Sequence, residues 1–150
     1  MKKSYIWIIV VIVLFAGAII WSRYAVKNDK DIVSKEGLHW HSKMSITING
    51  EKIAIPPNIG ITPYVHSPVH THDEELGTIH MEFTGLVKKD NLHLEKFFEA
   101  WGKRFDIQCI FDNCSPNGTI SMKVNSVPNS EYGEYVMHDG DLIEIDFTTK

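Results

Sequence analysis

The sequence predicts an α+β domain preceded by one N-terminal transmembrane helix. An uncharged apolar run covers residues 5–21, several short segments alternate apolar with polar residues, and one segment has apolar residues at helical spacing. The chain has 150 residues, which leaves room for one small domain after the apolar run. Its hydrophobic fraction of 43% is sufficient for a buried core and argues against global disorder.

The apolar run follows a short basic stretch and is long enough to cross a bilayer. We therefore predict a transmembrane signal-anchor that contacts lipid. Ala16-Gly17-Ala18 resembles a cleavage site, so a removable signal peptide is the alternative, but the apolar run continues beyond it. The predicted organisation is a cytoplasmic tip at 1–3, the anchor at 4–24, a polar tether at 25–37 and the α+β domain at 38–150.

Two rules give different orientations for the anchor, because basic residues lie on both sides of it. Lys2 and Lys3 precede it, whereas Arg23, Lys27, Lys30 and Lys35 follow it. A positive-inside count therefore places the domain in the cytoplasm. A single N-terminal apolar segment after Lys-Lys is nevertheless the usual form of an export signal. We expect a single-pass membrane protein with an extracytoplasmic domain.

The charge of the folded part limits its partners. Beyond residue 26 there are 12 Lys plus Arg against 19 Asp plus Glu, a net charge of −7, and no run of more than two basic residues. Nucleic-acid binding requires a basic stripe for phosphate contacts, so no nucleic-acid partner is expected. The expected partners are the bilayer and a membrane or extracytoplasmic protein.

The two cysteines, Cys109 and Cys114, lie five positions apart in a stretch rich in turn-forming residues. In an oxidising compartment they would form a structural disulfide, and in the cytosol they would be free thiols or metal ligands. Their spacing is not the Cys-x-x-Cys of thioredoxin-like sites. We predict the disulfide, with the two Cα atoms within about 7 Å.

The domain begins with a predicted β-hairpin. In residues 38–48 the apolar side chains all occupy even positions and the odd positions are all polar, which is typical of a half-buried strand. Asn49-Gly50 is a type I′ turn signal, and residues 52–55 form the returning strand before Pro56-Pro57 ends it.

The remaining elements follow from periodicity and from helix-breaking residues. Residues 58–77 contain several breakers and are predicted to form a long loop, whose length suggests a functional role. Strands are predicted at 78–84, 119–124 and 142–147, and a helix capped by Asp90-Asn91 is predicted through 92–105. The order of hairpin, strand, helix, strand and strand predicts a sheet with one covering helix.

Two resemblances accompany this pattern. The closing segment VMHDGDLIEIDF resembles the last turn and strand of β-grasp (ubiquitin-like) domains, which implies a β-grasp-like mixed sheet. The segments HWH, SPVHTHDEELGTIHMEF and FFEAWG resemble a histidine-rich family of membrane-anchored, uncharacterised proteins from archaea and uncultured bacteria. This second resemblance implies that the histidine segments occur together, and it implies no activity.

Six of the eight histidines lie in the first part of the domain, as two His-x-His pairs, one His-x-Glu and one single histidine. In extended backbone, residues i and i+2 project to the same side, so each pair can present two imidazoles to one ion. The strand parity places one pair and the His-x-Glu on the sheet face opposite the core, with the other pair folding over them from the long loop. The six are His39, His41, His66, His70, His72 and His80.

These histidines predict a transition-metal site, although surface histidines without a metal are the alternative. Imidazole nitrogens with an optional carboxylate suit zinc or copper better than Mg²⁺ or Ca²⁺. Asp73 and Glu82 are the carboxylates that could act as a ligand or as an outer hydrogen-bond acceptor, whereas His93 and His138 are expected to be structural or surface residues. The candidate ligands are His39, His41, His70, His72, His80, Glu82 and Asp73.

The predicted function is a membrane-anchored extracytoplasmic module that binds copper or zinc through clustered histidines. A β-grasp protein-interaction domain without metal and a small metallohydrolase are the alternatives. The chain contains no His-Glu-x-x-His, no Gly-x-Ser-x-Gly and no glycine-rich phosphate loop. A domain of this size also has little room for a deep cleft, so a binding module is favoured over an enzyme.

Overall fold

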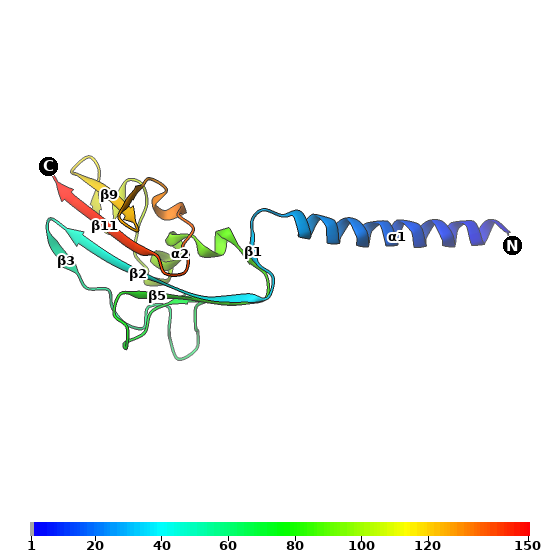
Figure 1. The fold of residues 1–150 in the computed structure, drawn as a ribbon, viewed down its shortest axis with the longest axis horizontal. Coiled ribbons are helices and arrows are strands. Elements are labelled where there is room, and N and C mark those ends of the chain that lie inside the picture. The colour runs from blue at the N-terminus through cyan, green and yellow to red at the C-terminus, as the bar shows by residue number, and fades with distance from the viewer. Residues whose placement is uncertain (1) are drawn as a thin grey trace. The chain divides into compact units, whose positions relative to one another are not determined.

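The computed structural model describes residues 2–150, which divide into two units on either side of the boundary between residues 32 and 33. The first unit contains helix α1 (Lys2–Asn28; Figure 1). Its segment Tyr5–Ala25 has a mean hydropathy of 2.5 and is long and apolar enough to cross a membrane, a property that signal sequences share. The helix continues four residues into the predicted tether, to Asn28. Met1, in the predicted cytoplasmic tip, lies outside the described residues.

The second unit contains a mixed seven-stranded sheet, which confirms the α+β class. Along the main path the strand order is β10-β9-β11-β2-β5-β4, and β3 pairs with β2 (Figure 1). The central pair, β2 and β11, is parallel, whereas the other pairs in this sheet are antiparallel. The strands are β2 (Gly37–Ile48), β3 (Glu51–Ile53), β4 (Val69–His70), β5 (Thr78–Thr84), β9 (Gly118–Val124), β10 (Val127–Asn129) and β11 (Leu142–Thr149).

Several short elements lie outside this sheet. Strands β1 and β6 form one two-stranded sheet, and β7 and β8 form another. The finer resemblance to β-grasp domains remains a prediction. The short elements are β1 (Ile32–Ser34), β6 (Val87–Lys88), β7 (Cys109–Ile110), β8 (Asn113–Cys114), and the 3-10 helices Lys89–Leu92 and Tyr132–Glu134.

The predicted hairpin is confirmed as β2 and β3. Asn49 and Gly50 both have positive φ, 53° and 82°, as a type I′ turn requires. The even positions of β2 face the core, where Ile46 is fully buried and Met44 is nearly so. Because successive side chains alternate, the odd positions of β2 face the other side of the sheet, and these include His39 and His41.

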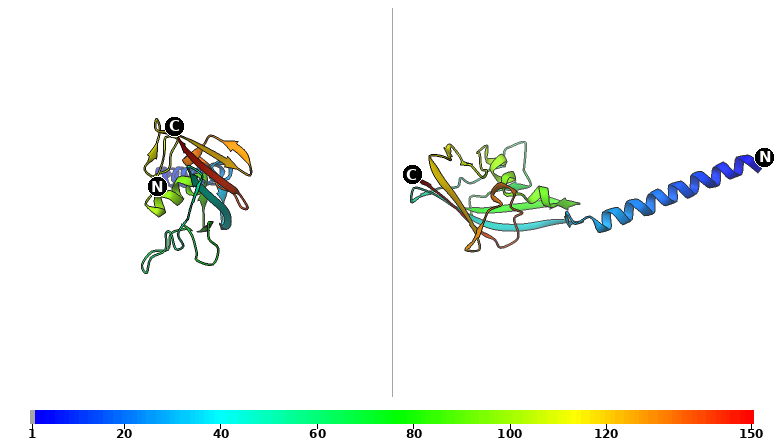
Figure 2. Two further views of the ribbon diagram at one scale, coloured as in Figure 1. Left: turned by 90° about the vertical axis from the view of Figure 1, so that its left-hand side faces the viewer. Right: turned by 90° about the horizontal axis from the view of Figure 1, so that it is seen from above.

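Helix α2 (Leu94–Trp101) lies on one side of β2 and β5 (Figure 2). Leu94, Phe97 and Phe98 are buried in the core that α2 shares with the sheet. The helix is shorter than predicted at both ends, since residues 89–92 form a 3-10 helix and Gly102 ends α2 with φ of 67°. Gly102 is suited to this position because it adopts the left-handed conformation without a Cβ clash.

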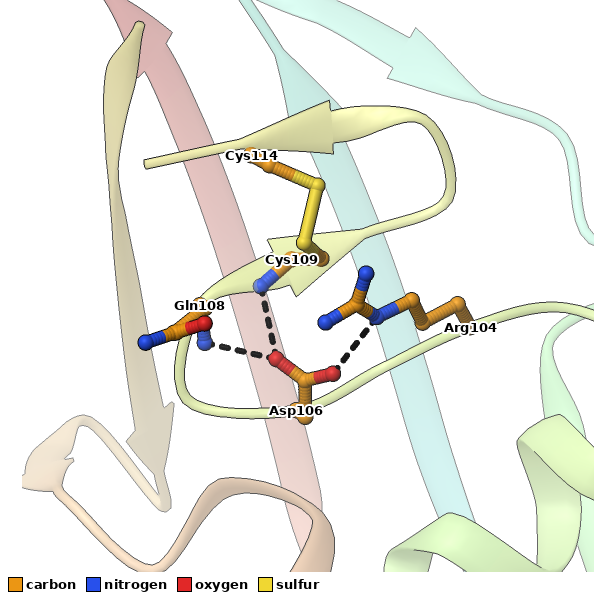
Figure 3. Close-up of a disulfide and its surroundings, with 5 residues drawn as sticks. All are labelled: Arg104, Asp106, Gln108, Cys109 and Cys114. Carbon is orange, nitrogen blue, oxygen red and sulfur yellow. Dashed lines mark hydrogen bonds and ion pairs between the residues drawn. A yellow bond between two sulfur atoms is a disulfide. The ribbon is translucent and has the colours of Figure 1, made fainter. Parts of the chain in front are cut away.

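The predicted disulfide joins Cys109 to Cys114, with a Cα–Cα distance of 4.2 Å. It closes the β7–β8 hairpin next to Asp106 (Figure 3). The Asp106 carboxylate accepts hydrogen bonds from Arg104 Nε and from the backbone N–H groups of Gln108 and Cys109. The cysteines are therefore part of a small loop whose polar groups are satisfied internally.

Candidate metal centre

Strand register places three histidines in one row across the sheet. His80 of β5 lies opposite His41 of β2 on one side and opposite His70 of β4 on the other. Paired residues in neighbouring strands project to the same face, so the three imidazoles lie close together. The ring centroid of His80 is 4.7 Å from that of His41 and 5.4 Å from that of His70.

The hydrogen bonds of Thr71 position the second His-x-His pair. Thr71 is buried, its backbone N–H donates to the Ile59 carbonyl, and its hydroxyl donates to the Pro56 carbonyl and accepts from the Ile59 N–H. These bonds tie Thr71 to the start of the predicted loop at 58–77, which also contains the short strand β4. His70 and His72 flank Thr71, and both contact His80, as the two-residue spacing predicts.

Gly60 allows the same loop to pack closely on itself. Its φ is +76°, and a Cβ at this position would lie 2.8 Å from the Val69 carbonyl oxygen. A residue with a side chain would therefore be strained in conformation and would also clash with β4. The path of the chain toward His70 depends on glycine at this position.

Two groups of potential metal ligands result, and His80 belongs to both. We call His70, His72, His80 and Glu82 the inner group, and His39, His41 and His80 the outer group. In each group, one ligand atom from every member lies within 4.8 Å of one from every other member, so each group could hold a metal ion. The ligand atoms of a tetrahedral zinc ion lie about 3.3 Å apart, which requires only small side-chain movements.

His70 already has the orientation expected of a metal ligand. Its Nδ1 lies 2.9 Å from the Ser67 carbonyl oxygen and donates to it, so in the neutral ring Nε2 carries a free lone pair. That Nε2 is 3.0 Å from Nε2 of His72. In protein metal sites, a ligating histidine usually donates its other ring nitrogen to an acceptor, which fixes the tautomer.

His80 has a buried nitrogen without a partner. Its Nε2 is inaccessible to solvent and has no hydrogen-bond partner, although most buried polar atoms have one. The residue is 9% exposed, while its neighbours Ile79 and Met81 are fully buried. As predicted, His80 lies on the face opposite the core, but the rings of His41, His70 and His72 enclose it there. That face is therefore not open at His80.

The pKa values of two imidazoles are shifted toward the neutral form. Burial lowers the pKa of His70, with contributions from His66 and His72, although the bond to the Ser67 carbonyl opposes the shift. Burial also lowers the pKa of His80, and the neighbouring His41 and His72 lower it further. Neutral imidazole is the form that binds metal, so burial and crowding prepare both residues as ligands.

Glu82 lies between the two groups. It belongs to the inner group, and its Oε1 is 3.1 Å from Nε2 of His39 in the outer group. Asp139 supports the outer group, because its Oδ1 accepts a hydrogen bond from the His41 backbone N–H and lies 4.0 Å from His41 Nδ1. Sequence reasoning did not identify Asp139, whose position depends on a contact across 98 residues.

The remaining candidates lie at the margin of the site or away from it. Asp73 is exposed and belongs to neither group, so its role as a ligand or outer acceptor remains a prediction. His66 is exposed, with its ring centroid 4.4 Å from that of His70. His93 lies near Glu95 and Glu134, and His138 lies between Trp40 and Tyr135.

The comparisons provide no relative from which a function could be transferred. The chain matches no family model, no curated protein and no solved structure. Its chemistry must therefore be inferred from the geometry of the two groups.

Proposed function

We propose that this protein is a membrane-anchored extracytoplasmic module that binds copper or zinc through the inner group. The principal support is the convergence of three imidazoles and one carboxylate within 4.8 Å, together with a buried His80 nitrogen that has no protein partner. A metal ion bound there would satisfy that nitrogen. The resulting four-coordinate set would have the ligand number and type that zinc sites use.

The type of ligand restricts the metal. Three of the four inner ligands are imidazoles, which favour zinc, copper, nickel and iron over Mg²⁺ and Ca²⁺, which prefer oxygen ligands. Both cysteines are in the disulfide, so neither supplies a thiolate. Zinc and copper both suit the inner group, and the alternative of a small metallohydrolase would use the same ion.

One feature supports the extracytoplasmic location, and a second supports the membrane anchor. The Cys109–Cys114 disulfide is of a kind that persists in oxidising compartments and is rare in the cytosol. The Tyr5–Ala25 segment of α1 could hold the domain at the membrane surface. A reporter enzyme that is active only after export, fused after Lys150, should be active in the full chain. Activity confined to a cytoplasmic reporter would contradict the proposed topology.

The proposed function is tested by metal analysis of the full chain, purified in detergent without chelators. We expect zinc or copper to copurify, or to bind at micromolar concentration, and to raise the unfolding temperature because the ion binds only the folded state. The His70→Ala/His72→Ala variant should lose this rise. His138→Ala, which removes a histidine outside both groups, should retain it.

A wild-type chain that is free of metal and takes up neither ion would contradict the proposal. That outcome would favour the alternative of an interaction domain in which the histidines have no metal-binding role.

A further inference from the structure

The two histidine groups differ in their access to solvent. In the outer group, the side chains of His39 and His41 are 61% and 43% exposed. In the inner group, His70 is fully buried, although the Glu82 side chain is 41% exposed. The imidazoles of the outer group are therefore easier to reach from solution than that of His70, while the inner group offers the more protected imidazoles and one more ligand.

His80, which belongs to both groups, and Glu82 lie where an ion would pass from one group to the other. The His80 ring centroid is 4.7 Å from that of His41 in the outer group and 4.7 Å from that of His72 in the inner group. Oε1 of Glu82, a member of the inner group, is 3.1 Å from Nε2 of His39 in the outer group. An ion bound in the outer group thus already has one inner ligand, and it can gain the others without first becoming free in solution.

Because His80 is common to both groups, occupancy of the outer and inner groups by two ions at the same time is disfavoured. A neutral imidazole has one free lone pair, so His80 could bind a second divalent cation only by losing its remaining ring proton, and repulsion between the two cations in this partly buried site would oppose that binding. Among the members of the two groups, only Glu82 carries a negative charge to offset it. The arrangement therefore suits one ion that alternates between two positions better than a pair of ions.

We infer that the two groups form a transfer path for a single divalent cation, with an outer receiving position and an inner holding position linked by His80. This inference rests on the proposed function. In the transfer step, the bonds from the ion to His39 and His41 break while bonds to His70 and His72 form, and the bond to His80 persists. The oxidation state of the ion does not change. The protein would then be a carrier that accepts and releases its ion.

The test compares equilibrium binding with exchange kinetics in the full chain, using Zn²⁺ and Cu²⁺ separately. The His39→Ala/His41→Ala variant removes the outer position only. Its affinity should stay within about threefold of wild type, whereas uptake and transfer to a chelator should both slow by about tenfold or more, because the path is removed in both directions.

The His70→Ala/His72→Ala variant removes the holding position. Its affinity should fall by about 100-fold, with exchange that remains fast. His138→Ala is the matched control and should resemble wild type in both measurements, with one ion bound per chain.

Three results would overturn the inference while leaving the proposed function intact. They are two ions bound per wild-type chain, unchanged exchange rates in the His39→Ala/His41→Ala variant, or loss of all affinity in that variant. A wild-type chain that binds neither ion would instead contradict the proposed function itself. If the double variant is not folded by circular dichroism, His39→Ala alone gives the same comparison, because this side chain is mostly exposed.

Discussion

The disulfide loop and the histidine groups are both clusters of polar or reactive side chains, but they differ in how their bonding capacity is used. In the loop, Asp106 accepts three hydrogen bonds, and each cysteine is bonded to the other. In the histidine groups, ring nitrogens converge on one another, and Nε2 of His80 has no partner.

This difference separates a structural cluster from one suited to a ligand. A cluster whose groups satisfy one another gains little from an added ion. A cluster of converging ring nitrogens in which one buried nitrogen, Nε2 of His80, has no partner leaves a space where the cost of burial is not matched by a bond. An ion placed in that space would supply the missing interaction. Substitutions in the loop should therefore change stability alone, and substitutions among the histidines should change metal binding.

Removal of the disulfide should have the largest effect on stability. The Cys109→Ser/Cys114→Ser variant should lose about 2 kcal/mol of unfolding free energy, because the unfolded chain is no longer restricted by the small ring. Urea denaturation of the two proteins measures this loss, and metal affinity should not change. Full alkylation of both thiols in wild-type protein isolated without reductant would contradict the disulfide itself.

Substitution of His80 should lower metal affinity and leave stability nearly unchanged, which is the reverse of the effect expected for the disulfide variant. His80→Ala removes the ligand common to both groups, so metal affinity should fall about tenfold or more, equivalent to about 1.4 kcal/mol. The unfolding temperature of the metal-free protein should change little, because the substitution removes a buried ring together with its unpartnered nitrogen. Competition with a chelator and thermal melts measure the two quantities. Equal affinity in wild type and variant would remove His80 from the site.

A comparison of two carboxylates sharpens the assignment of ligands. Glu82→Gln should weaken metal binding severalfold, since it keeps the side-chain size and removes the only charge in the inner group. Asp73→Asn should leave affinity unchanged, because Asp73 is exposed and lies in neither group. The same chelator competition measures both variants. A larger effect from Asp73 than from Glu82 would reverse this assignment.

Local sequence patterns predicted the elements that depend on local interactions. The β2–β3 hairpin follows from alternation and from Asn49-Gly50, and the row of His41 and His80 follows from strand parity. The ends of α2 were predicted less well, because the apolar spacing continues to Phe105, which pairs with Ile110 outside the helix. Strand β4 was missed, since two residues carry no periodicity and its pairing with β5 is determined by tertiary contacts.

Sequence patterns also predicted the candidate site only in part. Two-residue spacing identified the histidine pairs, yet no sequence pattern could identify the Ser67 carbonyl, because a backbone acceptor has no residue signature. Asp73 lies in a bend, where strand alternation gives no guide to its direction, and it is exposed and outside both groups, so its role remains a prediction. The position of Asp139 beside His41 depends on a contact between distant parts of the chain.

The smallest expected effect is a pH-dependent one in the disulfide loop. Burial alone would raise the pKa of Asp106, but the hydrogen bonds from Arg104 Nε and from the Gln108 and Cys109 N–H groups outweigh it, so the pKa is lowered. A carboxyl group whose pKa is lower in the folded state stabilises the fold above its unfolded pKa. That contribution is lost as the pH falls through the folded pKa.

Asp106→Asn should therefore destabilise the protein at neutral pH by less than the loss of the disulfide, because the side chain is 39% exposed and solvent screens its charge. At an acidic pH below the folded pKa, where the wild-type carboxyl is also protonated, wild type and variant should have nearly equal stability. Denaturant titrations at both pH values measure the difference, with Asp112→Asn in the same loop as the control, since Asp112 is exposed. A difference between wild type and Asp106→Asn that is as large in acid as at neutral pH would show that the carboxylate charge is not what stabilises this loop.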